Sequence, residues 1–152
     1  MTNVTMTGFV KHESIPLYQA AADVLLMPYS RSIFASSGQD IAEVINPMKM
    51  FEYMAAARAI VCADLNVIRE VLNEGNAVFC EPDDIGKRRP DGSTFAHRLE
   101  GWKAAIEFLL GDESRRHELG SQARKDVERF TWVKREEMVM EGFLSMDKSF
   151  ID

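Results

Sequence analysis

Short apolar runs alternate with helical patterns along the first part of the chain, and this alternation constrains the fold more than any other feature. The runs at 23–27 and 59–63 are almost continuously apolar, and Pro28 ends the first of them. Such runs are typical of strands buried on both faces of a sheet. Strands that alternate with helices across short loops form parallel sheets covered by helices. We therefore predict an α/β fold, with a parallel sheet and helices on both faces.

The same patterns predict the order of the elements. Expected strands span 4–10, 23–27, 59–63 and 77–80, and expected helices span 14–22, 47–57, 67–75, 99–111, 112–130 and 131–146. The last three helices form an extension over about 98–150. A sheet of this size that begins at Val4 is typical of the later part of a larger doubly wound domain. We therefore expect the chain to be a fragment of a longer protein.

Composition bounds the class of protein. With 152 residues, of which 46% are hydrophobic and 28% charged, the chain can bury one core, so we expect a single domain over residues 1–152. No stretch approaches the roughly 18 to 20 apolar residues of a membrane span, and the opening residues lack the features of a secretory signal. We expect a cytoplasmic protein. The formal charge of −6 predicts no general attraction for nucleic acid.

Cysteines and adjacent acids do not form metal-ligand patterns. Cys62 and Cys80 each end an apolar run without the spacing of a metal site, which is typical of buried thiols in a reducing compartment. Asp83 and Asp84 are adjacent, so in a strand or loop their side chains point apart. We predict no metal site.

The segment 46–55 reads as a helix start that can receive an anion. Asn46 can cap the free N–H groups, and Pro47 suits the first helical position because its missing N–H costs nothing there. The next amides add to the positive end of the helix dipole, and Lys49 supplies a full charge nearby. Glu52, three residues on, faces the same side and can accept hydrogen bonds from a pair of hydroxyls. An anion site beside a diol acceptor predicts nucleotide binding.

A structural interpretation of the same segment also stands. Met48, Phe51 and Ala55 can form a core stripe, and Lys49 and Glu52 can form a solvated ion pair. The segment alone does not choose between the two. The mixed, polar stretch 29–45 before it is long for a loop in a compact domain, and loops of that length tend to be functional.

Together these segments resemble a known family. The residues that carry the likeness are Gly8-Phe-Val10, Ile15-Pro16, Ala22-Asp23-Val24, Met27-Pro28, Pro47 to Ala55, Ile60-Val61, Ile68 to Val71, Pro82-Asp83-Asp84 and Phe130-Thr131-Trp132. They are similar to the carboxy-terminal domain of glycosyltransferase family 4, often called group 1. That family has the GT-B fold, in which two Rossmann-like domains face each other across a cleft and the second holds most of the nucleotide-sugar donor. The likeness covers residues 4–132.

The resemblance implies roles at matching positions. Glu52 matches the second glutamate of the family's Glu-x7-Glu motif and would bind the ribose hydroxyls. The segment Pro47-Met48-Lys49 would present its main-chain groups to the pyrophosphate or the sugar. This agrees with the anion site read from the residues themselves.

At other positions the resemblance is looser. Gly8, Phe9 and Val10 match the lining of the base pocket, which acts largely through backbone. The first glutamate of the motif falls on Val44, and the nearest carboxylate, Glu43, is one residue early. A one-residue shift turns a side chain well away, so Glu43 does not simply inherit the donor-sugar role.

Asp40 is the other loop acid that could take that role, and both acids also fit a solvated loop. In the family, the basic residues that neutralise the leaving diphosphate, the glycine-rich loop and the acceptor domain precede the matched segment. The resemblance therefore implies an N-terminal acceptor-binding domain as partner, and we expect no turnover from the isolated chain. Whether the parent touches the inner membrane face is left open.

The function implied is retaining glycosyl transfer from a nucleotide sugar, such as a UDP- or GDP-sugar, without a metal ion. Two alternatives remain. One is a GT-B epimerase that acts on the donor sugar, and the other is a non-catalytic interaction module with a vestigial nucleotide pocket. The base, the sugar, the acceptor and the pathway are not specified by the sequence.

Overall fold

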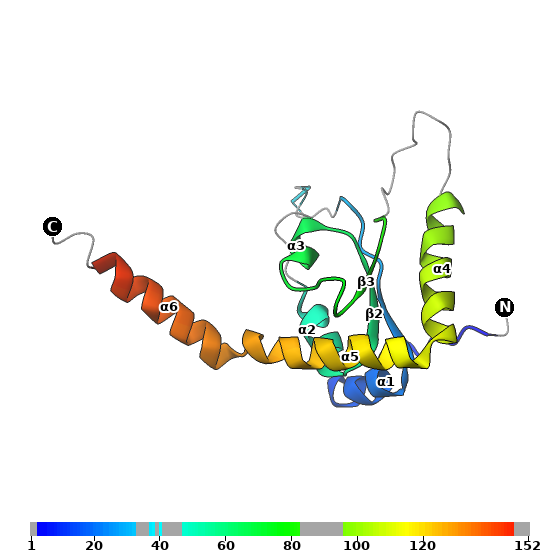
Figure 1. Ribbon diagram of the computed structural model, residues 1–152, viewed down its shortest axis with the longest axis horizontal. Helices are drawn as coiled ribbons and strands as arrows, with labels where there is room; N and C mark the ends of the chain where they lie inside the picture. The colour runs from blue at the N-terminus through cyan, green and yellow to red at the C-terminus, as the bar shows by residue number, and fades with distance from the viewer. Residues whose placement is uncertain (1–2, 33–36, 39, 41–46, 83–95, 148–152) are drawn as a thin grey trace.

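The computed structural model describes residues 3–32, 37–38, 40, 47–82 and 96–147, with only the backbone for 96–98 and 142–147. Three strands, β1 (Val24–Met27), β2 (Ala59–Ala63) and β3 (Val78–Cys80), form a parallel sheet in the order β1-β2-β3. Around it lie α1 (Ile15–Ala21), α2 (Met48–Ala55), α3 (Asn66–Arg69), α4 (Ala96–Gly111), α5 (Glu113–Val127) and α6 (Trp132–Asp147) (Figure 1). The predicted α/β fold with a parallel sheet is confirmed.

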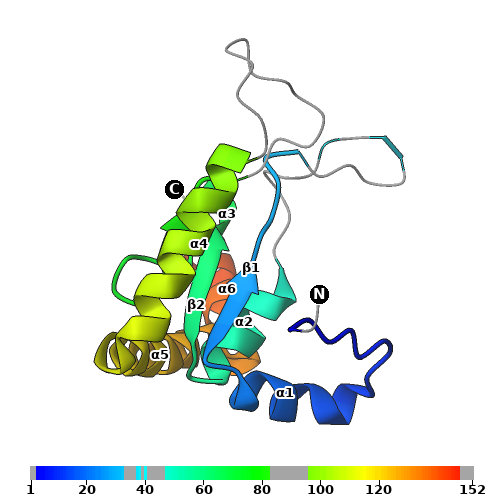
Figure 2. The same ribbon diagram turned by 90° about the vertical axis from the view of Figure 1, so that its right-hand side faces the viewer.

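The central strand β2 explains why the sheet is covered on both faces. All five of its residues are buried, and alternate side chains enter different cores. Ile60 and Cys62 join the core beneath α2 and α3, whereas Ala59 and Val61 join the core beneath α4. Figure 2 shows α2 and α4 on opposite sides of the strands. The helix α5 closes the end of both layers, because its Ala123 and Leu119 belong to different cores.

Strand β1 is less buried than the sequence predicts. Its side chains alternate, and Leu26 is 39% exposed although the run 23–27 is almost continuously apolar. Within the described residues β1 pairs only with β2, so it is an edge strand. An edge position leaves one face of a strand less covered than a central position does.

The expected strand at 4–10 is wrong. Residues 3–10 form no strand, and Val4, Met6 and Phe9 are 62%, 92% and 94% exposed. Alternating apolar and polar residues specify a strand only where a neighbouring strand offers hydrogen bonds and a face to bury. Here the segment leads into α1 along one side of α2 instead (Figure 2), and its Thr7 and Val10 face residues of both helices across a cavity.

Helix ends agree with the sequence at several caps and differ at α3. Asp112 accepts a hydrogen bond from the Arg115 amide at 2.8 Å, and Thr131 accepts one from the Lys134 amide at 3.3 Å. Both side chains therefore cap a helix at the residue where the expected helices 112–130 and 131–146 begin. The predicted helix 67–75 is too long, since α3 ends at Arg69. In the segment that follows, Asn76 Oδ1 accepts a hydrogen bond from the Asn73 amide, and Asn73 Oδ1 accepts one from the Gly75 amide. These side chains take backbone amides that a longer helix would use.

The last helix, α6, projects away from the rest of the molecule (Figure 1). Two of its apolar side chains, Trp132 and Val139, are 77% and 50% exposed. None of the helices in the described ranges is long and apolar enough to cross a membrane. The expected helix at 131–146 is present as α6, but these two apolar residues are not buried.

Candidate functional site

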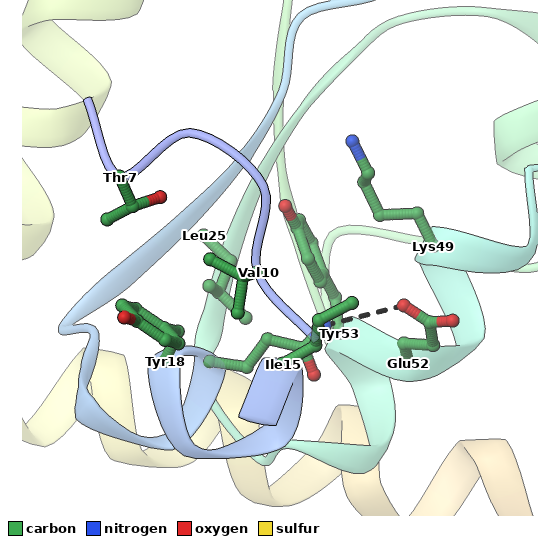
Figure 3. Close-up of a pocket in the computed structure, with 9 residues that line it drawn as sticks. Thr7, Val10, Ile15, Tyr18, Leu25, Lys49, Glu52 and Tyr53 are labelled. Carbon is green, nitrogen blue, oxygen red and sulfur yellow. Dashed lines mark hydrogen bonds between the residues drawn. The ribbon is translucent and has the colours of Figure 1, made fainter. Parts of the chain in front are cut away.

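A cavity of about 330 Å³ lies between the N-terminal segment, α1, β1 and α2 (Figure 3). The described residues that line it are Thr7, Val10, Ile15, Tyr18, Gln19, Leu25, Lys49, Glu52 and Tyr53. One side of the lining is apolar and aromatic, and the α2 side carries the charged groups. Such a division suits a ligand with a flat apolar part and a charged, hydroxylated part.

Helix α2 places the charged groups. It begins at Met48, so Pro47 occupies the cap position rather than the predicted first helical position. The Pro47 carbonyl accepts a hydrogen bond from the Met50 amide at 2.9 Å, and Pro47 itself is buried. The first amides of a helix have no carbonyl partner within it, so this end carries partial positive charge. Met48 is 59% exposed and belongs to neither core.

Lys49 and Glu52 both reach the cavity from α2, because residues three apart share a helix face. Both side chains are exposed, and Figure 3 shows them pointing in different directions from the helix. Among the described residues no ion pair joins them, so the interpretation as a solvated pair is not what the structure shows. Met50 and Met54, on the opposite side of α2, are fully buried.

A second element holds the Glu52 carboxylate. The side-chain amide Nε2 of Gln19, on α1, donates a hydrogen bond to Glu52 Oε2 at 3.4 Å. Gln19 is 8% exposed, which makes it one of few buried polar side chains in the described chain. The dashed line in Figure 3 marks this bond.

Next to the carboxylate, Tyr53 adds a neutral hydroxyl to the cavity. Burial raises the pKa of Tyr53, and the charges of Tyr29 and Glu52 raise it further. Burial likewise raises the pKa of Tyr29. A phenol with a raised pKa stays protonated at neutral pH, so Tyr53 can donate a hydrogen bond to a ligand.

The predicted base-pocket residues are only partly brought to the cavity. Val10 lines it, whereas Phe9 is 94% exposed. Gly8 has a positive φ of 66°, a conformation that glycine adopts without the strain of a side chain. The turn at Gly8 lies between two lining residues, Thr7 and Val10. Thr7 was not predicted.

Among the described residues, no acid of the loop before α2 lines the cavity. Glu43 and Asn46 lie outside the described residues, so their predicted roles stay predictions. Asp40 is exposed and is not among the residues that line the cavity.

Sequence reasoning missed Gln19, Leu25 and Tyr53 as lining residues. Ile15 and Tyr18 lie in the expected helix 14–22, but the sequence did not predict them at a ligand site. The sequence contains one indication that Gln19 has a special role, which is that a polar residue stands between Tyr18 and Ala21 on a short apolar helix. Nothing in the sequence paired it with Glu52, because 33 positions separate the two residues.

Comparisons with solved structures agree with this fold. Sucrose-phosphate synthase from Thermosynechococcus elongatus superposes with a TM-score of 0.66 at 19% identity, over 95% of this chain and 31% of that one. HepE from Anabaena, in complex with UDP, gives a TM-score of 0.61 at 17% identity, over 86% of this chain and 30% of that one. HepE in complex with UDP-glucose gives 0.58, also at 17% identity, over 86% and 30%. The chain thus spans about a third of the length of these proteins.

Sequence comparison gives information on the family, which the likeness in fold does not. No curated protein matches the chain significantly. The family described as "Glycosyl transferases group 1" matches residues 1–88, which include the segment 3–10, α1, β1, α2 and the cavity between them. This is more than half of the chain. The protein therefore belongs to the group 1 glycosyltransferases.

Proposed function

We propose that the cavity between α1 and α2 binds the nucleoside diphosphate of a sugar donor, and that the chain serves as donor-binding part of a retaining glycosyltransferase. One observation carries the proposal. A carboxylate, Glu52, and a cation, Lys49, open onto the same cavity from one face of α2, close to the positive end of that helix.

Glu52 is the proposed ribose ligand. An ionised carboxylate accepts hydrogen bonds only, and its two oxygens can receive a vicinal pair of hydroxyls. Its Oε2 already accepts from Gln19, which leaves Oε1 and the remaining acceptor capacity of Oε2 for a ligand. Hydrogen bonds to a charged acceptor are stronger than those between neutral groups.

Lys49 and the first amides of α2 are the proposed diphosphate ligands. An ammonium group and a helix N-terminus both stabilise negative charge, and they do so most strongly where charge develops on the leaving diphosphate. We propose that donor binding needs no metal ion. The affinity should then be unchanged by a chelator, and loss of binding on chelation would contradict this part of the proposal.

The apolar side of the cavity is the proposed base site. Val10, Tyr18 and Leu25 line it, and apolar or aromatic surfaces suit the flat face of a base. A UDP-sugar is the first donor to test, because HepE is described in complex with UDP and with UDP-glucose.

We also propose that transfer requires a second, acceptor-binding domain. On this proposal the chain alone binds donor and does not transfer sugar. Sugar transfer by this chain above the rate of donor hydrolysis would contradict the proposal that a second domain is required.

Calorimetric titration of the chain with UDP, GDP and ADP tests the central proposal. We expect UDP to bind, and Glu52→Ala to weaken binding at least about tenfold, since a hydrogen bond to a charged group contributes about 1.5 to 3 kcal/mol. Glu70→Ala is the matched control, because Glu70 is an exposed acid that does not line the cavity. It should bind UDP as the unsubstituted chain does.

One observation favours a second candidate, the non-catalytic interaction module. Side chains of α6, including Trp132, Met138 and Met140, are 77%, 70% and 54% exposed. Apolar surface of this kind is typical of sites that contact other proteins. If no nucleotide binds, or if Glu52→Ala binds UDP as well as the unsubstituted chain, the module becomes the better account.

A further inference from the structure

Gln19 is a polar residue that the fold buries. Its helix, α1, otherwise presents Ile15 and Tyr18 to the same cavity, and Gln19 is the residue of α1 that is buried, at 8% exposed. Burying an amide costs free energy unless it is hydrogen-bonded. Its partner is the carboxylate of Glu52 on α2, at 3.4 Å. The contact therefore joins α1 to α2.

The geometry points to Gln19 as the residue that positions the Glu52 carboxylate for the vicinal diol of the ribose. The inference rests on the function proposed above and adds a residue to it. Glu52 stands on an exposed helix face, where a free glutamate samples several rotamers. A donor fixed at Oε2 removes part of that freedom and turns the carboxylate toward the cavity. Part of the entropic cost of ordering Glu52 is then met before the nucleotide arrives.

Gln19 acts through Glu52, so its effect depends on the hydroxyls that Glu52 receives. A ligand that lacks those hydroxyls gains nothing from an ordered carboxylate. Gln19 should therefore distinguish UDP from 2′,3′-dideoxy-UDP. A purely structural role would instead change the binding of both nucleotides in the same proportion.

The test uses Gln19→Met, which keeps the length of the side chain and removes the amide donor. Gln122→Met is the matched control. Gln122, on α5, also donates its amide to a carboxylate, Asp126 Oδ1, at 3.1 Å, but it does not line the cavity. Affinities for UDP and for 2′,3′-dideoxy-UDP are measured by calorimetry for the unsubstituted chain and for both variants, and circular dichroism checks folding.

We expect Gln19→Met to weaken UDP about fivefold, in the range of one hydrogen bond, and to leave 2′,3′-dideoxy-UDP unchanged. Gln122→Met should change neither. Equal weakening of both nucleotides by Gln19→Met, or no weakening of either, would overturn the positioning role while the proposed function stands. If Gln19→Met does not fold, Gln19→Glu replaces it, since this isosteric residue at neutral pH puts a like charge beside Glu52 and should weaken UDP more than the dideoxy nucleotide.

Failure of the proposed function has a different signature. In that case the unsubstituted chain binds none of the nucleotides, and the inference falls with it. A nuclear magnetic resonance spectrum of the labelled chain then still reports on the contact. The side-chain amide resonance of Gln19 should move on Glu52→Ala and not on Glu70→Ala, and an unmoved resonance would show that the hydrogen bond itself is absent.

Discussion

Gly120 of α5 packs directly against the backbone of Ala57, at the turn that follows the site helix α2. A Cβ atom at position 120 would lie 2.7 Å from the Ala57 carbonyl carbon and 3.1 Å from the Arg58 amide nitrogen. Ala57 itself has a positive φ of 55°, which is unfavourable for a residue with a side chain. The turn between α2 and β2 therefore combines a strained residue with a close helix contact. This contact packs α5 against the turn that follows α2.

Substituting Gly120 by Ala should destabilise the chain by about 1 to 3 kcal/mol, because the backbone that the new methyl group meets cannot simply turn aside. Urea unfolding measures the change. Gly101→Ala is the control, since a Cβ there meets nothing within 4 Å on an exposed face of α4. That variant should be more stable by about 0.5 to 1 kcal/mol. Equal effects at the two positions would contradict the close packing.

Substituting Ala57 by Gly should stabilise the chain by about 0.5 to 1 kcal/mol, because glycine adopts a positive φ without steric cost. The gain is smaller than the strain removed, since glycine also gains freedom in the unfolded chain. Ala55→Gly, two residues earlier at the end of α2, should instead lose about 1 kcal/mol. Thermal unfolding distinguishes the two, and destabilisation by Ala57→Gly would be evidence against a strained turn.

Asn76 should be costly to replace. It is fully buried, its Nδ2 donates to Asp126 Oδ2 at 2.9 Å, and its Oδ1 accepts from the Asn73 amide at 2.8 Å. Asn76→Ala removes the hydrogen bonds to both partners, and we expect the free energy of unfolding in urea to fall by about 2 kcal/mol. Asn66→Ala, at an exposed position of α3, should stay within about 0.5 kcal/mol. A small effect at Asn76 would mean that water replaces the lost bonds.

Lys49→Gln should weaken UDP about fivefold to tenfold and leave uridine binding unchanged, because only the diphosphate offers charge to the ammonium group. Calorimetry with both ligands provides the comparison. Lys103→Gln is the control, since Lys103 is an exposed lysine of α4 that does not line the cavity. Parallel losses for UDP and uridine would place Lys49 outside the diphosphate site.

Because of its two cysteines, the chain should lose stability as the pH becomes alkaline. Cys62 and Cys80 are buried and free, and burial raises the pKa of Cys62 to about 12, with the charges of Cys80 and Asp64 adding to the rise. The unfolded thiol titrates near pH 8.5. The folded state therefore holds the proton longer, so its stabilising contribution is complete below about pH 8.5 and is lost progressively as the pH rises toward 12.

Urea unfolding between pH 8 and pH 10 checks this expectation. The free energy of unfolding should fall over that range, and it should fall less in Cys62→Ala, whose overall stability is lower because of the cavity it creates. The native thiols should also resist a thiol reagent at pH 8 and react once the chain is unfolded. Rapid labelling of Cys62 in the native chain would contradict its burial.

Local periodicity explains how much of the fold the sequence predicted. The runs 23–27, 59–63 and 77–80 are strands or contain them, and α2 begins one residue from its expected start. Lys49 and Glu52 share a helix face because they are three residues apart, which is a property of any helix. The caps Asp112 and Thr131 were predictable for the same reason, since a cap and its amide are close in sequence.

Contacts between distant residues were decided by the tertiary structure. Residues 4–10 alternate between apolar and polar types as a strand does, yet they form no strand. A strand needs a neighbouring strand to pair with, and the alternation does not show whether one is present. The amide of Gln19 meets the carboxylate of Glu52 only because α1 and α2 pack beside the same edge strand, β1. A sequence pattern predicts the position of a residue within its own helix or strand, but not its contacts with distant residues. The chain's own sequence thus determined which groups α2 presents, and only packing determined what surrounds them.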